Sequence, residues 1–216
     1  HAYDPGYQVT FALMLTSAII TCTLTTRLKD HAKMSAQAAF RTKILFDTNQ
    51  LLQRAKSEEE ILSQTASQLM KLLNRSLIVY PEQNGDLGSE QFFGVNGETA
   101  QNIFSAPEER DAANWTFANK KRSGAGTDSY PDAKGLYLAL RTGGGVFGVI
   151  GIDLSEKPLD AFENSVLLSI LGEGALAIEN RRNALEKEQA TVQAKNEELR
   201  ANLLRTISHD LRTPLT

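Results

Sequence analysis

The run LYLALRTGGGVFGVIGIDL at residues 136–154 decides the fold that we predict for this chain. Two apolar, strand-like segments, 136–141 and 146–154, flank a cluster of glycines. Such a cluster between two strands favours a tight hairpin turn. A phosphate-binding loop is the alternative for these glycines and for the second cluster at 123–128, but neither has the required lysine or a strand-loop-helix setting. We therefore expect a β-hairpin and no nucleotide loop.

The segments around this hairpin predict alternating helices and strands. Ser57 followed by three glutamates has the pattern of a capping box, so a helix should start near Glu58. The segments 77–80 and 91–95 resemble strands, with a turn at 84–86 between them. A helical segment at 107–121 precedes the hairpin, and another helix starts near Leu159. This order predicts an α+β fold, in which an antiparallel sheet is flanked by helices.

The N-terminal segment 5–26 contains no charged residue, and it is long enough to cross a bilayer as a helix. It is rich in threonines, whose hydroxyls can bond to the backbone of their own helix. Lysines and arginines follow it, so the positive-inside rule places the residues after Thr26 in the cytoplasm. An amphipathic pattern at 32–54 predicts that this helix continues inward. A buried helix of a soluble protein is the alternative interpretation.

The C-terminal run SHDLRTPLT at 208–216 combines a histidine with groups that suit phosphoryl chemistry. Neutral imidazole is a competent nucleophile, and Asp210 next to His209 can accept its proton. Arg205 and Arg212 share a helix face with His209 and would contact phosphate, and Thr213 follows one turn after the histidine. We expect His209 to face water. A surface histidine of no functional importance is the alternative.

The segment between the hairpin and this histidine carries a sparse heptad repeat. Apolar residues recur every seven positions at Ile178, Leu185, Val192 and Leu199, which predicts one lane of a parallel coiled-coil homodimer. The second lane is polar and includes Arg182. Such a weak coiled coil suits a signal conduit, and a solvated dimer spacer without switching is the alternative.

Composition excludes some classes of function. The net charge of −3 gives no argument for direct binding to nucleic acid. Cys22 is the only cysteine, so the chain has no intrachain disulfide and no cysteine-rich metal site, and we predict no metal site. Trp115, Phe117, Asp128 and Tyr137 are candidates for lining a small-molecule pocket. Ordinary core packing and turn chemistry are the stronger interpretation of these four residues.

Two sets of residues resemble known families. The element order, with Asn114-Trp115-Thr116-Phe117 and the later 123–128 glycine cluster, is similar to the GAF region of KdpD-type potassium-responsive sensor kinases. The run at 208–216 resembles the phosphoacceptor box of sensor histidine kinases. The resemblance divides the chain into a transmembrane segment (1–29), a connecting helix (30–56), a GAF domain (57–177), a coiled-coil helix (178–202) and the start of a dimerisation and phosphoacceptor domain (203–216).

This resemblance implies a function for the parent protein. It would be a two-component histidine kinase in the bacterial inner membrane, in which the GAF domain relays a signal to autophosphorylated His209. A response regulator of KdpE type would receive the phosphate and control potassium uptake genes. ATP and Mg²⁺ would be bound by a catalytic domain absent from this chain, so the fragment alone should be inactive. Thr213 would serve a phosphatase activity.

The sequence leaves two other classes of function open. A non-enzymatic GAF module that binds a small ligand is the main alternative, and its ligand is not readable from the sequence. A structural membrane adaptor with a coiled coil is the other.

Overall fold

The computed structural model describes the backbone of residues 5–94 and 101–212 and the side chains of residues 10–94 and 101–205. The chain divides into two compact units, residues 1–47 and 48–216.

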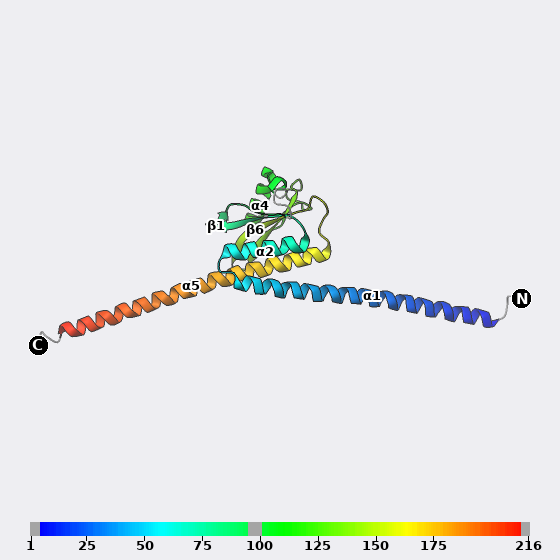
Figure 1. Cartoon of the computed structure of the whole chain (residues 1–216), viewed down its shortest axis with the longest axis horizontal. Helices are drawn as coiled ribbons and strands as arrows, with labels where there is room; N and C mark the ends of the chain where they lie inside the picture. Colours follow the sequence, from blue (N-terminus) through cyan, green and yellow to red (C-terminus); the bar gives the residue numbers. More distant parts are fainter. Residues whose placement is uncertain (1–4, 95–100, 213–216) are drawn as a thin grey trace. The chain divides into compact units, whose positions relative to one another are not determined.

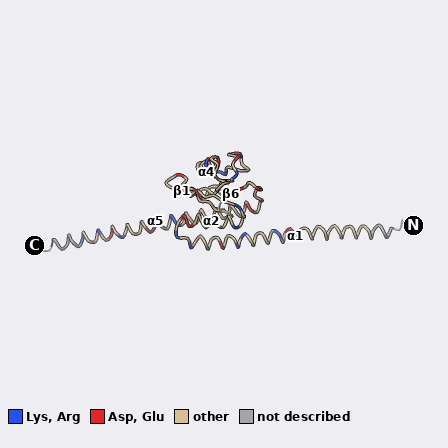
Figure 2. The backbone as a smooth tube through the Cα atoms, turned by 45° about the horizontal axis from the view of Figure 1, so that its top comes forward, with Lys and Arg blue, Asp and Glu red and all other residues tan. Residues whose placement is uncertain are grey.

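The described part of the first unit is the long helix α1, Pro5–Arg54, whose last residues, 48–54, belong to the second unit. Its large apolar side chains from Phe11 to Phe40 are exposed, and Phe11 and Met14 each have 70% of their surface accessible. Figure 2 shows uncharged residues along the N-terminal part of α1 that it colours, and charged residues only further along. The predicted bonds from hydroxyls to the helix backbone are confirmed: Thr21 donates to the carbonyl of Ser17 at 2.8 Å, and Thr25 donates to that of Thr21 at 2.7 Å.

The second unit contains an antiparallel sheet in the strand order β2-β1-β6-β5-β4, with β3 also paired to β1. The strands are β1 (Leu77–Gln83), β2 (Asp86–Leu87), β3 (Gln91–Phe93), β4 (Ser123–Gly124), β5 (Gly135–Thr142) and β6 (Gly145–Asp153). The predicted hairpin is confirmed, because β5 pairs with β6 and the last pair, Thr142 with Gly145, encloses a turn of two glycines. This hairpin forms the centre of the sheet.

Helices cover both faces of this sheet. Figure 1 shows α4 (Pro107–Asn119) on one side, and α2 (Glu58–Leu73) with α5 (Ala161–Arg212) on the other. Side chains alternate between the two faces along each strand. Tyr137 therefore packs on the α4 side, while its neighbour Leu138 points to the α5 side. The α+β prediction, with an antiparallel sheet between helices, is confirmed.

Local sequence signals account for two of the boundaries. The hydroxyl of Ser57 accepts a hydrogen bond from the Glu60 amide at 3.1 Å, and the Glu60 carboxylate accepts one from the Lys56 amide at 2.7 Å. This is the predicted capping box at the start of α2. Asn84 and Gly85 have φ of 55° and 92°, so they form the left-handed turn that joins β1 to β2.

Helix α5 is 52 residues long, and its two halves have different surroundings. Ile170 and Ile178 in the first half are completely buried in the domain core. Leu185, Val192 and Leu199 in the second half are 38%, 55% and 60% exposed. The predicted heptad lane therefore needs a correction: Ile178 contributes to the core of its own domain, because the helix is still packed on the sheet there, and the exposed lane starts at Leu185.

Candidate signalling helix and ligand cavity

The helix α5 carries the predicted phosphoacceptor residue. Its backbone is helical through His209, Asp210 and Arg212, so the histidine lies on the helix that also packs on the sheet. Arg205 is exposed on the same helix, one turn before the histidine. The side-chain geometry at 206–212 and the whole of Thr213 lie outside the described residues. The predicted roles of these side chains stay predictions.

Arg182 anchors α5 to the domain through polar contacts, at the point where the helix extends beyond the sheet. Its guanidinium donates to Glu58 of α2 at 2.8 and 2.9 Å and to Glu82 of β1 at 2.9 Å. It also lies 5.0 Å from the centre of the Phe147 ring on β6, a cation–π distance. Hydrogen bonds and charge from Glu58, followed by those from Glu82, raise the pKa of Arg182, so it stays a cation.

The carboxylate of Glu82 takes part in the same set of contacts. The Gly85 amide, which donates to it at 2.9 Å, is the main cause that lowers the pKa of Glu82, and Arg182 adds to this effect. Arg181, the preceding residue of α5, donates to the Lys56 carbonyl at 2.9 Å. One turn of α5 thus contacts β1, β6 and the start of α2.

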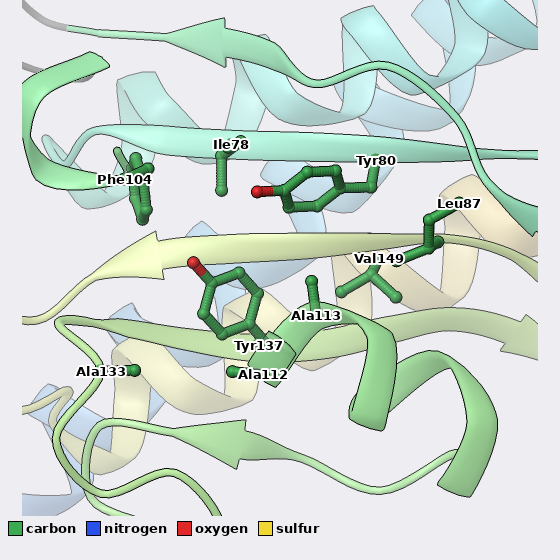
Figure 3. Packing of buried hydrophobic residues seen from close by; sticks show 9 residues of the cluster. All are labelled: Ile78, Tyr80, Leu87, Phe104, Ala112, Ala113, Ala133, Tyr137 and Val149. Carbon is green, nitrogen blue, oxygen red and sulfur yellow. The ribbon is translucent and has the colours of Figure 1, made fainter. Parts of the chain in front are cut away.

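The space between the sheet and α4 is occupied by protein side chains. Figure 3 shows the rings of Tyr80 and Tyr137 among Phe104 and the alanines of α4. The buried carboxylate of Glu109 accepts hydrogen bonds from the Tyr137 hydroxyl at 2.7 Å and from the amides of residues 134 and 135 at 2.7 and 3.2 Å. Burial raises the pKa of Tyr80 to about 12 and raises that of Tyr137 further, so both stay neutral.

A separate cavity of about 920 Å³ is lined by residues of α4, of the segment after α4, of β5 and of α5. The indole of Trp115 and the apolar side chains of Leu138, Leu168 and Leu171 contribute to its walls. Its charged lining residues are four cations and one carboxylate: Lys120, Lys121, Arg122, Arg141 and Asp128. The lining is therefore both apolar and strongly basic.

The four predicted pocket residues do not meet in one place. Trp115 and Asp128 line the cavity, whereas Tyr137 is fully buried beside Glu109 and Phe117 packs against the cluster around Tyr137. Two physical reasons account for this separation. Neighbours two apart on a helix point about 200° apart, which separates Trp115 from Phe117. Tyr137 is fully buried beneath α4, where its hydroxyl donates to Glu109, so it does not reach the cavity.

Several residues of these sites have no role in the sequence-based predictions. The run Lys120-Lys121-Arg122 after α4 is visible as a basic cluster, and its position after a helix could have indicated a site. Glu109 and Arg182 gave no such signal, because the partners of Glu109 lie 25 to 28 residues away in the sequence and the carboxylate partners of Arg182 lie 100 and 124 residues away. Only the fold brings these partners together.

Two other properties bear on function. By length and composition, two helices in the described part of the chain are apolar enough to cross a membrane. The first lies in α1 and has no buried residues in its apolar window, and the second lies in α5, where 39% of the window is buried. Among residues whose side chains are described, no group of three or more His, Cys, Asp or Glu could hold a metal ion.

The antiparallel sheet with helices on both faces, followed by a long exit helix, has the fold of a GAF domain. The GAF domain of a Pseudomonas syringae pv. tomato protein described as a sensor histidine kinase superposes with a TM-score of 0.51 at 19% identity. That match covers 74% of this chain and 97% of the other and concerns the fold alone. No family model matches the chain.

The particular resemblance is to the KdpD-type sensor proteins. The sensor protein KdpD of Clostridium acetobutylicum is 35% identical over 214 residues, which are 99% of this chain and 24% of that protein. KdpD of Escherichia coli strain K12 is 29% identical over 216 residues, which are 99% of this chain and 23% of that protein. The predicted likeness to KdpD-type sensor proteins is thus confirmed from end to end of the chain, which spans about a quarter of these relatives.

Proposed function

We propose that this chain is the membrane-proximal signalling segment of a sensor histidine kinase of KdpD type. The observation that carries the proposal is the continuity of α5, which starts on the sheet of the GAF domain and is helical through His209. A displacement of the domain would therefore act directly on the helix that presents the reactive histidine. The end-to-end similarity to KdpD sensor proteins supports the same function.

The residues of the C-terminal box divide the chemistry among them. An imidazole nitrogen of His209 attacks the γ-phosphorus of ATP, and the bond to the departing ADP breaks. Asp210 accepts or orients the imidazole proton, while Arg205 and Arg212 contact the phosphate oxygens. A catalytic domain outside this chain holds ATP and Mg²⁺. The phosphate then passes to an aspartate of a KdpE-type response regulator that controls potassium uptake genes.

The remaining parts carry the signal to this box. The N-terminal part of α1 crosses the bacterial inner membrane, and the residues after Thr26 lie in the cytoplasm. Two copies of the chain pair in parallel through the exposed lane of α5 that starts at Leu185. Thr213 positions water against the phosphorylated regulator in the phosphatase reaction, so it acts in dephosphorylation and not in the first transfer.

Phosphate transfer tests this function directly. A protein that joins this chain to the ATP-binding domain of its own gene is incubated with ATP labelled in the γ-phosphate, and acid-labile phosphate is measured. We expect His209→Gln to abolish the label, whereas His31→Gln on α1 should leave it unchanged. An unchanged label in His209→Gln would rule out this histidine as the acceptor.

Thr213→Ala should prolong the phosphorylated state of the regulator.

A GAF module that only binds a small ligand is the second candidate function. The basic cavity beside Trp115 is the observation that favours it. Failure of the phosphate transfer assay in a folded dimer with an active ATP-binding domain, together with a ligand-induced rise in melting temperature, would support this candidate over the kinase.

A further inference from the structure

The cavity beside β5 combines two kinds of wall that face the same space. Trp115 of α4 and Leu138 of β5 are apolar, and Leu171 of α5 closes the cavity from the helix side. Its volume of about 920 Å³ lies within the range of roughly 300–1,000 Å³ that is typical of small-molecule sites. An aromatic ring system of moderate size would therefore find both room and apolar contact here.

The basic side chains of this cavity have no acidic partners in the part of the chain that the structure describes. Lys120, Lys121, Arg122 and Arg141 all line the cavity, and none of them forms an ion pair with a described residue. Arg182, by contrast, lies 2.8 Å from the carboxylate of Glu58. Four like charges around one cavity repel each other, and a bound anion would relieve this repulsion.

Local backbone geometry gathers these cations. Helix α4 ends at Asn119, and Lys120 takes a left-handed conformation with φ of 56° that stops the helix. The amide of Lys120 bonds back to the Thr116 carbonyl at 2.9 Å, which fixes the start of the basic run. Arg141 comes from β5, at the irregularity in its pairing with β6. The cations thus approach the cavity from two elements that are far apart in the sequence.

We propose that this cavity binds a soluble organic phosphate with a flat aromatic body, the chemistry of a nucleotide. The phosphates lie among the lysines and arginines, because charge-assisted hydrogen bonds to phosphate are the strongest polar contacts available there. The aromatic body packs on the indole of Trp115, where stacking is favourable for any base. Asp128 is an acceptor for a hydroxyl or amino group of the same ligand.

This site is distinct from the interior beneath α4, where Glu109 and the two tyrosines occupy the space. It also contacts the signalling helix, because Leu168, Leu171 and Gly172 of α5 are among its lining residues. Binding itself is a property of this domain and requires no kinase activity. Only its consequence, a shift of α5 that changes phosphorylation of His209, rests on the proposed function.

Trp115 is the only tryptophan of the chain, so its fluorescence reports on the cavity without interference. The full chain in a neutral detergent is titrated with ATP, with adenosine, with inorganic pyrophosphate, and with micelles containing phosphatidylglycerol. Free tryptophan in the same solutions corrects for light absorbed by the nucleotide. We expect saturable quenching by ATP, weaker binding of pyrophosphate and adenosine, and loss of affinity as salt increases.

Charge reversal identifies the site. The double variant Lys120→Glu and Lys121→Glu should weaken ATP binding by at least about tenfold, because it removes charge-assisted bonds to phosphate. Lys187→Glu with Lys195→Glu on the exposed part of α5 is the matched control and should bind as the unmodified chain does. All four substituted positions are exposed, so circular dichroism should show native folding in both variants.

Three results would overturn the proposal. Equal affinity for adenosine and ATP would show that phosphate is not recognised, and a response to phosphatidylglycerol alone would assign the cavity to a lipid headgroup. Saturable ATP binding that charge reversal at Lys120 and Lys121 leaves unchanged would place the nucleotide elsewhere. Because none of these readings requires phosphate transfer, failure of this proposal and failure of the kinase proposal are distinguishable.

Discussion

The two halves of α5 belong to one continuous helix but obey different packing rules. Residues 161–182 lie against the sheet and α2, and Ile170 there has no exposed surface. Residues 183–205 are exposed throughout, and Leu199 keeps 60% of its surface accessible. The apolar residues of the first half already have partners within the chain, whereas those of the second half have none among the described residues of this chain.

This difference shows which part of α5 the domain itself stabilises. The first half is held by the core and by Arg182 at its end, so it should respond to substitution as any core element does. The second half gains nothing from the domain, and its apolar residues at intervals of seven suit a second copy of the chain. The following predictions test where the boundary between these two behaviours lies.

The largest effect on stability should come from removing a buried side chain of the first half of α5. Ile170→Ala should lower the free energy of unfolding by about 2–5 kcal/mol, because it removes buried methyl groups and leaves a cavity. Leu199→Ala should change the unfolding of the single domain by less than about 0.5 kcal/mol. Chemical denaturation followed by Trp115 fluorescence measures both. A similar loss in both variants would mean that the two halves are stabilised alike.

Two glycines of α5 offer a sharper contrast within the first half. A Cβ at Gly174 would lie 2.6 Å from the hydroxyl of Thr65, which is buried and bonded to the Ile61 carbonyl at 2.7 Å. Gly174→Ala should therefore destabilise the domain, by about 1–3 kcal/mol. A Cβ at Gly172 meets no atom within 4 Å, so Gly172→Ala should stabilise it by up to about 1 kcal/mol.

Thermal melting of both glycine variants checks the sign. Opposite shifts would confirm that close contact between α2 and α5 occurs at Gly174 and not at Gly172. Melting temperatures that move in the same direction would contradict this contact.

A smaller effect is expected at the boundary between the halves. Arg182→Ala removes the contacts to Glu58, Glu82 and Phe147, yet its cost should be no more than about 1 kcal/mol, because water screens a guanidinium that is 37% exposed. Arg200→Ala, on the exposed half, should have no measurable effect on unfolding. Hydrogen exchange of the amides at 179–186 should increase in Arg182→Ala alone. Equal exchange in both variants would show that Arg182 does not anchor α5 to the domain.

The smallest effect concerns pH. The pKa of Glu82 is lowered below its ordinary value of 4.5 in the folded protein, mainly by the Gly85 amide and also by Arg182. Its contribution to stability is therefore fully present above the ordinary value and is lost as pH falls through the lowered pKa. Glu82→Gln should reduce stability at neutral pH by a few tenths of a kcal/mol and flatten the acid side of the profile.

Urea denaturation at a series of pH values measures this profile. Because the Gly85 amide is the larger cause, Arg182→Ala should keep most of the acid dependence that Glu82→Gln removes. Complete loss of the acid dependence in Arg182→Ala would mean that Arg182, and not the Gly85 amide, is the main cause of the lowered pKa of Glu82.

The elements were predictable where a local pattern determines them. The glycines at 143–145 indicate a hairpin because they separate two apolar, strand-like segments. The turn at Asn84 and Gly85 specifies its hairpin because few other residues accept those left-handed backbone angles. Ser57 and Glu60 specify a helix start because their bonds close within four residues. The pocket was only half predictable: Trp115 and Asp128 line one cavity, but Tyr137 is buried beneath α4.

By itself, the sequence determined the order of helices and strands, the uncharged segment at the start, the histidine box at the end and the resemblance to KdpD-type sensor proteins. These follow from periodicity, from turn chemistry and from short motifs, all of which act over a few residues. Only the tertiary structure decided that Ile178 belongs to the core, that Arg182 joins α5 to Glu58 and Glu82, and that Arg141 shares a cavity with the basic run after α4. Their partners come from distant parts of the chain, and burial and charge pairing depend on which distant segments the fold brings together.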